Sequence, residues 1–281
     1  MNMLLKRCLC CLMALWMALS CAAFAEEEAP QVTVNEMYLM LASAEKPMSA
    51  QYEPQNLVHL VARRNDENGM NANNGVYLAS SMGVQLVAEV AQALTDMMHA
   101  ADMAGVELYA KQGYRSYEEE VKRYERMKDR GETHKPGETD YQTGLAVSVV
   151  SKAWRTKTLT DAFGSTDEAR WLAANCARYG FVLRYPEGKQ HVTGCAWEPW
   201  HLRYVGELAA DIMQLNHLCL EEFVTGVGLT GECPETAPAG EAEPTVLEDV
   251  PFELPEILPA GPLVLDQTGP DGDNEIVLFP D

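Results

Sequence analysis

Apolar side chains recur at intervals of three and four residues between Met82 and Ala104, which is the spacing of one face of an α-helix. Gly105 follows this stretch and is a residue type that commonly ends a helix. The pattern predicts an amphipathic helix over residues 82–104. Its apolar stripe consists of Leu86, Val90, Leu94, Met97 and Ala101.

A short strand and a second helix are predicted to follow. The apolar run from Val106 to Ala110 predicts the strand, after which Arg115 lies at a strand-to-helix junction. Ser116 stands three residues before Glu119, which is the capping-box spacing, and the helix is predicted to run to about Arg130. Such junctions often carry functional side chains, so Arg115 is a candidate site residue.

The second half of the chain predicts more strands and one further capped helix. Residues 145–150 are rich in β-forming side chains, so residues 146 and 148 should share one face of a strand. A second capping box at residues 165–168 predicts a helix that Gly180 ends. Residues 181–185 and 192–197 are predicted to be strands. The predicted fold class is α+β, with a small antiparallel sheet packed against helices.

The first 25 residues have the layout of a signal peptide. Lys6 and Arg7 precede an apolar run, and small residues stand before Glu26. The run is shorter than the roughly 20 residues that span a bilayer. We therefore expect cleavage after Ala25, export to the cell envelope or medium, and no stable transmembrane segment afterwards. Cys21 leaves a lipoprotein as an alternative.

The other end of the chain is acidic and rich in proline. From Glu235 to Asp281 there is no Lys, Arg or His. This composition predicts a disordered tail, whose apolar clusters at residues 257–258 and 276–279 could dock on a protein partner. The predicted organisation is a signal peptide (1–25), an N-terminal segment (26–47), one domain (48–233) and the tail (234–281).

Charge and cysteine content narrow the possible partners and chemistry. The chain has 42 acidic and 21 basic residues, a net charge of −21, which argues against nucleic acid and anionic polymers as partners. An exported domain would retain Cys176, Cys195, Cys219 and Cys233 where disulfides can form. Pairing of Cys219 with Cys233, pairing of Cys176 with Cys195, and four free thiols all remain open.

Glu198 and His201 form the most informative pair in the chain because a carboxylate stands three residues before an imidazole. In a zinc peptidase such a pair supplies a general base and a metal ligand. Zinc needs about three protein ligands and an open position. In the segment from Thr139 to Val149, the residues at ligand spacing are Tyr141 and Ser148, and neither is a good zinc ligand.

Four motifs together resemble VanY-type D-alanyl-D-alanine carboxypeptidases. They are Gly113-Tyr114-Arg115-Ser116-Tyr117, Gln142-Thr143-Gly144-Leu145-Ala146-Val147, Tyr179-Gly180-Phe181-Val182-Leu183-Arg184-Tyr185-Pro186 and Glu198-Pro199-Trp200-His201. The resemblance covers roughly residues 48–227 and implies a fold like that of Hedgehog and DD-peptidase domains. It also implies binding of peptidoglycan stem peptides.

The resemblance assigns roles to individual residues. In such families zinc is held by a His just before the Gln-Thr-Gly segment, an Asp seven residues later, and the His of Glu-Pro-Trp-His. Only His201 remains here, and Tyr141 and Ser148 stand at the other two positions. The catalytic Glu corresponds to Glu198, and the Arg that contacts substrate near the scissile carbonyl corresponds to Arg115.

Two functional hypotheses follow. In the first, the domain lacks zinc, and its residues Glu198, Arg115 and His201 are vestigial. The cleft then binds stem peptides without hydrolysing them. Arg115 would then grip a carboxylate or pair with an acid such as Glu198, and Tyr141 and Ser148 would offer hydroxyls to the peptide or simply fill the former metal site.

In the alternative, the protein is an active zinc D,D-carboxypeptidase with rearranged metal ligands. Glu198 would activate a zinc-bound water, Arg115 would polarise the terminal amide carbonyl, and His201 would anchor the metal. The replacement ligands would come from His134, Asp140, His191 or Cys195. A structural envelope protein whose tail is the active part is a third possibility.

Overall fold

The computed structural model describes residues 32–60, 62–63, 71–72, 76–130, 134–238, 240, 243–247 and 250–254. The chain divides into two units, Met1–Val32 and Thr33–Asp281, and only Val32 of the first is described. The predicted signal peptide and the tail beyond Leu254 lie outside the described residues. Within the described ranges, no helix combines the length and apolarity needed to cross a membrane.

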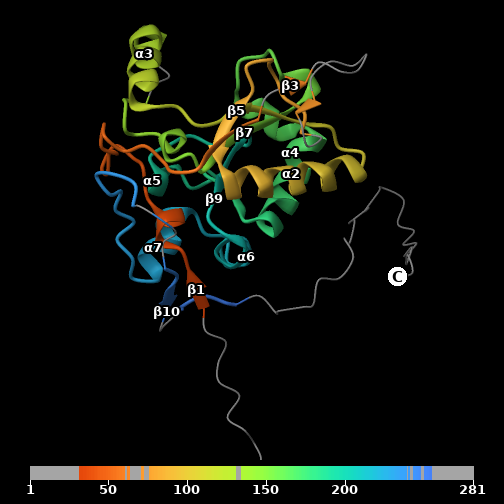
Figure 1. Cartoon of the computed structure of the whole chain (residues 1–281). Helices are drawn as coiled ribbons and strands as arrows, with labels where there is room; N and C mark the ends of the chain where they lie inside the picture. The colour runs from red at the N-terminus through yellow and green to blue at the C-terminus, as the bar shows by residue number, and fades with distance from the viewer. Residues whose placement is uncertain are drawn as a thin grey trace, which may run out of the picture. The chain divides into compact units, whose positions relative to one another are not determined.

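A four-stranded sheet forms the centre of the second unit (Figure 1). Its order is β6 (Leu108–Gln112), β7 (Ala146–Ser151), β9 (His201–Tyr204) and β8 (Phe181–Leu183). All neighbouring strands are antiparallel, which confirms the predicted fold class. Ser148 of β7 lies directly opposite His201 of β9, so the two side chains share one face of the sheet.

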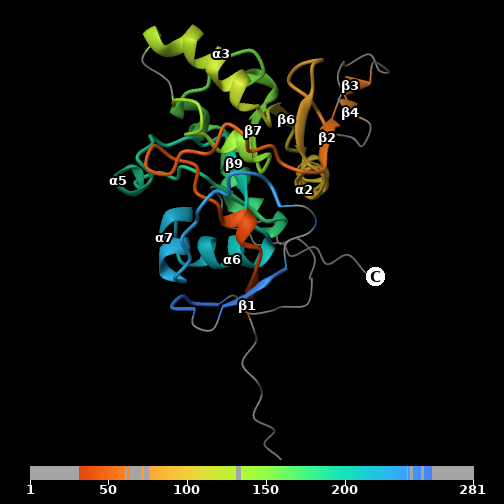
Figure 2. The ribbon, with the colours of Figure 1, turned by 60° about the vertical axis from the view of Figure 1, so that its left-hand side comes forward.

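Helix α2 (Ala88–Met103) carries the predicted apolar stripe, and Val90, Leu94, Met97 and Ala101 are buried. Its predicted start was wrong, because Val84–Val87 forms strand β5, paired with β2 (Leu57–Leu60). Buried and less buried residues alternate in β5, so a strand pattern runs directly into a helical one. In Figure 2, α2 lies next to β2.

The first predicted capping box is confirmed, and the second is wrong by one residue although a helix starts there. Ser116 caps α3 (Tyr117–Met127), since its hydroxyl accepts from the Glu119 amide and the Glu119 side chain accepts from the Ser116 amide. A short 3₁₀ turn, η2 (Lys128–Arg130), continues this helix. Thr166 rather than Ser165 caps α4 (Asp167–Asn175), which is followed by η6 (Cys176–Tyr179) and the left-handed Gly180.

The strand predicted at residues 192–197 is wrong. The chain there forms the short helix α5 (Gln190–Thr193), which Gly194 ends at a φ of 72°. An irregular stretch then leads to β9. Gly188 also has a positive φ, and Pro199 has no amide hydrogen for a ladder. Extended pairing therefore resumes only at His201.

The remaining elements surround this centre. The last two helices are α6 (Glu207–Leu215) and α7 (Leu220–Gly226). Strands β3 (Ala62–Arg63) and β4 (Asn71–Ala72) form a small antiparallel sheet. The other short 3₁₀ elements are η1 (Glu36–Leu39), η3 (Asp140–Thr143), η4 (Lys152–Trp154) and η5 (Asp161–Ser165).

The described part of the predicted tail packs on the domain rather than forming a free spacer. Strand β10 (Thr245–Leu247) pairs with β1 (Val32–Val34) of the N-terminal segment. Phe252 stacks on Phe223 of α7 with ring centroids 6.0 Å apart. The two segments that flank the predicted domain therefore join each other at its surface. Among the described residues, the free thiols are Cys176, Cys195, Cys219 and Cys233.

Candidate functional site

Tyr141, Ser148 and His201 come together from three elements. Tyr141 lies on η3, Ser148 on β7 and His201 on β9. The Tyr141 ring stacks on His201 with centroids 4.6 Å apart, and its hydroxyl oxygen lies 2.5 Å from Ser148 Oγ. Their exposed fractions are 6%, 0% and 2%, so the three side chains form one closed contact.

This donor set does not fit a zinc ion. Zinc prefers neutral imidazole, thiolate and carboxylate ligands, and its ligands must be deprotonated. Burial raises the pKa of Tyr141 although the nearby Arg115 guanidinium acts in the opposite direction, so the phenol stays protonated at neutral pH. Its hydroxyl and that of Ser148 are hydrogen-bonded to each other. In the described part of the chain, no three His, Cys, Asp or Glu residues are grouped to hold a metal.

Glu198 and His201 are in direct contact. Glu198 Oε2 lies 2.7 Å from His201 Nδ1. The other ring nitrogen, Nε2, is buried and has no hydrogen-bond partner among the described residues. The Tyr185 ring meets the imidazole edge-on at 5.1 Å. The imidazole is therefore held on three sides by a carboxylate and two aromatic rings.

Arg115 borders the cluster formed by Tyr141, Ser148 and His201. Its ion pair is with Glu120 rather than with Glu198. Its Nε pairs with the buried carboxylate of Glu120, and its Nη1 donates to Gln112 Oε1 at 3.2 Å. The guanidinium carbon lies 3.9 Å from the centroid of the Tyr141 ring. Arg115 Nη2 makes no hydrogen bond with the described residues and the side chain is part-exposed, so the Nη2 edge of the guanidinium can donate to an anion.

Asp140 does not serve the site as a ligand, because its carboxylate is committed to two buried arginines. Arg184 Nε lies 2.7 Å from one carboxylate oxygen and Arg203 Nη1 lies 3.0 Å from the other. Burial acts to raise the pKa of Asp140, but Arg184 and Arg203 outweigh it and hold this pKa below its usual value. Arg184 also pairs with Glu221 of α7 through two hydrogen bonds.

This network was missed in the sequence, where Arg184 directly follows the apolar residues of β8 and Arg203 stands next to Leu202 in β9. Arg203 also donates to the main-chain oxygens of Tyr38 and Met40, each at 3.0 Å. The contacts of Asp140, Arg184 and Arg203 therefore connect η3, the end of β8, β9, α7 and the N-terminal segment. An arginine within a run of apolar residues is the signal that could have indicated this network. A buried guanidinium needs a carboxylate partner.

Two of the predicted replacement ligands, His134 and Cys195, contact each other, whereas His191 lies elsewhere. His134 Nε2 lies 2.9 Å from Cys195 Sγ, and the His134 ring stacks on Tyr185 at 6.1 Å. Burial lowers the pKa of His134 and raises the pKa of Cys195 to about 11, so both groups are neutral near pH 7. His191 is exposed on α5 and lines a separate hollow.

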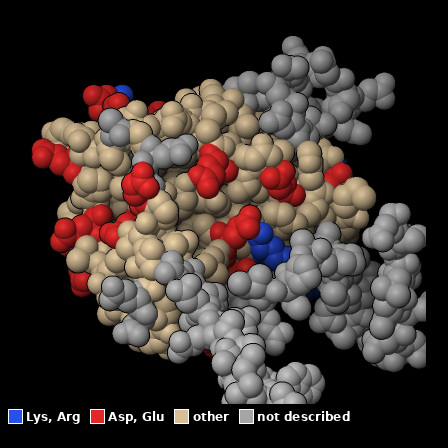
Figure 3. Space-filling view, turned by 60° about the horizontal axis from the view of Figure 1, so that its bottom comes forward, with Lys and Arg blue, Asp and Glu red and all other residues tan. Residues whose placement is uncertain are grey.

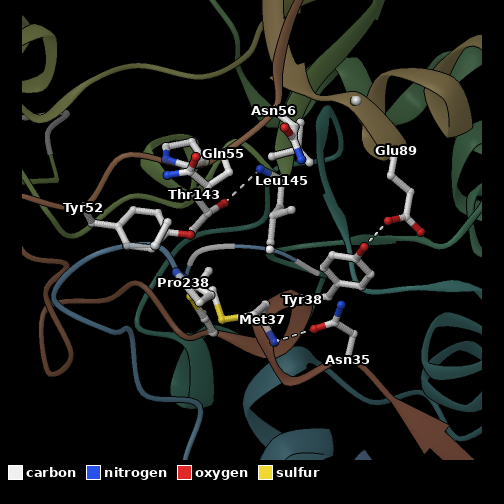
Figure 4. A pocket seen from close by; sticks show the side chains of 16 residues that line it. Asn35, Met37, Tyr38, Tyr52, Gln55, Asn56, Glu89, Thr143, Leu145 and Pro238 are labelled. Atoms are coloured by element: carbon white, nitrogen blue, oxygen red, sulfur yellow. Dashed lines mark hydrogen bonds between the residues drawn. The ribbon is translucent and has the colours of Figure 1, made fainter. Parts of the chain in front are cut away.

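A cavity of about 530 Å³ lies on another part of η3 and does not include the cluster (Figure 4). Tyr38, Tyr52, Glu89 and Thr143 are among its lining residues, and the Tyr38 hydroxyl donates to Glu89. Tyr141, Ser148 and His201 are not among them. Figure 3 shows acidic side chains scattered over one face of the molecule, with few basic ones, in keeping with the net charge of −21.

The sequence model of one family, described as VanY: D-alanyl-D-alanine carboxypeptidase, matches residues 83–207. The D-alanyl-D-alanine carboxypeptidase of Enterococcus faecium is 30% identical over 198 residues, which cover 69% of this chain and 60% of that protein. The chain belongs to the VanY family of D-alanyl-D-alanine carboxypeptidases. It spans 52%, 60% and 57% of the first three curated relatives that it matches.

Two of the solved structures to which the chain is similar illustrate this fold. One is the LdcB LD-carboxypeptidase, described for its peptidoglycan recognition, with 36% identity, a TM-score of 0.52, and coverage of 66% of this chain and 85% of that one. The other is a mutant of the vancomycin resistance D,D-pentapeptidase VanY in complex with Zn(II), with 28% identity, a TM-score of 0.50, and coverage of 66% and 98%.

Proposed function

We propose that this protein is an exported, zinc-deficient member of the VanY family that binds peptidoglycan stem peptides in the cell envelope without hydrolysing them. The observation that carries the proposal is the hydrogen bond between Tyr141 and Ser148 beside His201. It joins two neutral hydroxyls at the positions where the family resemblance places a His and an Asp ligand. With one imidazole left, the site has too few ligands for a catalytic zinc ion.

Peptide binding is supported by what the site retains. Arg115 keeps a part-exposed guanidinium with Nη2 available, and a guanidinium suits the carboxylate that ends a stem peptide. Glu198 is also part-exposed, with a side-chain exposure of 26%. Export is supported by the leader-like composition of residues 1–25.

The test is a titration of the full chain with a stem pentapeptide that ends in D-Ala-D-Ala, together with an assay for released D-alanine. We expect binding and no release. Arg115→Gln removes a charge-assisted contact of about 1.5–3 kcal/mol, so it should weaken binding roughly 10-fold to 100-fold. Arg170→Gln, at an exposed arginine of α4, is the matched control and should bind like the wild type. Release of D-alanine, either with added zinc or after metal chelation, would contradict the proposal, as would unchanged binding in Arg115→Gln.

The alternative function is an active zinc D,D-carboxypeptidase with rearranged ligands. Two observations favour it: the unpartnered, buried Nε2 of His201, and the contact between His134 and Cys195 nearby. It would require His134 and Cys195 to leave each other and approach His201. Zinc-dependent release of D-alanine in the assay above, lost in Cys195→Ser, would support this alternative.

A further inference from the structure

A hollow of about 480 Å³ is lined by Gly188, Gln190, His191 and Trp197. Trp197 directly precedes Glu198, whose carboxylate contacts His201, so a lining residue of the hollow and a residue of the proposed peptide site are neighbours in the chain. Binding sites for small molecules commonly have volumes of about 300–1,000 Å³. The hollow therefore has room for one or two sugar rings.

The position of the Trp197 ring is set by a glycine. The indole packs against the backbone of Gly164 in η5 so closely that any Cβ at residue 164 would collide with the ring. The side chain is only half-buried and the rest of it lines the hollow. A fixed indole offers a flat apolar surface together with one N–H donor. This part of the hollow is therefore preorganised.

The other lining side chains are polar, and none of them is a carboxylate or an ammonium group. Gln190 and His191 are exposed on α5 and bring an amide and an imidazole to the hollow. Lys189, just before them, donates to both oxygens of Glu222 at 2.9 and 2.8 Å, which anchors this segment to α7. Gly188 leaves the adjoining space open, since no atom lies within 4 Å of where its Cβ would be.

We propose that this hollow is a saccharide subsite for an N-acetylated sugar of the peptidoglycan glycan strand. A sugar ring has a C–H face that packs on an indole, and its hydroxyl and acetamido groups match the hydrogen-bonding groups of Gln190 and His191. A hollow lined by an amide, an imidazole and an indole suits a neutral sugar better than a charged ligand. The inference rests on the proposed function and narrows its ligand class from free stem peptides to glycan-linked ones.

The test compares three ligands by calorimetric titration of the full chain: a stem pentapeptide, the same peptide on its N-acetylglucosamine–N-acetylmuramic acid disaccharide, and tri-N-acetylchitotriose. Stacking and one or two hydrogen bonds correspond to a gain of about tenfold in affinity for the disaccharide-peptide over the peptide. Trp197→Ala should remove this gain and leave the affinity for the free peptide unchanged. Trp171→Phe, at a half-buried tryptophan outside the hollow, is the control and should keep the gain.

Gln190→Ala provides a second variant at an exposed residue where the fold is not at risk, and it should reduce the gain by about threefold or more. Equal affinities for the peptide and the disaccharide-peptide in the wild type would overturn the inference while the proposed function stands. A gain that survives in both Trp197→Ala and Gln190→Ala would also overturn it. If no peptide binds, the proposed function fails, and chitotriose binding that depends on Trp197 would still support the subsite. Absence of chitotriose binding as well would overturn both.

Discussion

Replacing Asp140 by Asn should destabilise the protein strongly, because it removes the central charge of a buried network. Asp140, Arg184 and Arg203 have side-chain exposures of 0%, 1% and 0%, and the carboxylate lies 2.7 and 3.0 Å from the two guanidinium groups. Removing one partner of a buried ion pair costs about 3–5 kcal/mol, because the remaining charge is left without compensation. Glu221 still pairs with Arg184, whereas Arg203 keeps only main-chain acceptors.

The assay is urea unfolding of the wild type and of Asp140→Asn at pH 7, with free energies of unfolding obtained by linear extrapolation. Asp167→Asn is the matched control, since Asp167 pairs with Arg170 at the surface, where both side chains are mostly exposed. Exposed pairs contribute about 0–1 kcal/mol, so the control should lose less than about 1 kcal/mol. A loss in Asp140→Asn no larger than that in the control would refute the reasoning.

The same pair of proteins gives a pH dependence with a definite sign. Arg184 and Arg203 hold the pKa of Asp140 below its usual value, so the stabilisation is complete above the unfolded-state pKa of about 3.9. It is lost as the pH falls through the folded-state pKa. The difference between wild type and Asp140→Asn should therefore be constant from about pH 5 to 7 and shrink below about pH 4. A difference that grows on acidification would contradict the assignment.

Three smaller effects follow from the same contacts. Tyr141→Phe removes the partner of the buried Ser148 hydroxyl and should cost about 1–3 kcal/mol in urea unfolding; an unchanged stability would mean that this hydrogen bond contributes nothing. Gly164→Ala forces a Cβ against the Trp197 ring and should cost about 1–3 kcal/mol, seen as a lower Tm; an unchanged Tm would show that the ring can move away freely. Burial raises the pKa of Cys195 to about 11, so its alkylation at pH 8 should be at least about tenfold slower than that of glutathione, and an equal rate would contradict the burial.

The sequence predicted the parts of the fold that local rules govern. The capping box at Ser116 depends only on residues three apart, and it marks the start of α3. The β-forming side chains of residues 145–150 predicted a strand, and the two-residue period of a strand predicted that residues 146 and 148 share a face of β7. In each case the deciding interaction is short in sequence.

Interactions between distant segments could not be predicted in this way. The strand at Thr245–Leu247 lies in a stretch whose composition indicates a spacer, and it forms only because β1 offers an edge more than 200 residues earlier. Glu120 gave no sign that it would bind Arg115, since it stands in a charged helix in which it is the one buried residue. Residues 192–197 have strand-forming side chains, but the positive φ of Gly194 and the ring of Pro199 prevent a continuous ladder.

The most direct test of the central claim is the zinc content of the full chain after equilibration with trace zinc and dialysis. The account predicts well under one zinc per chain in the wild type, and no change in His201→Ala. The double variant Tyr141→His with Ser148→Asp restores the ligand set that the family resemblance implies and should bind about one zinc per chain. About one zinc in the wild type that disappears in His201→Ala would contradict the account.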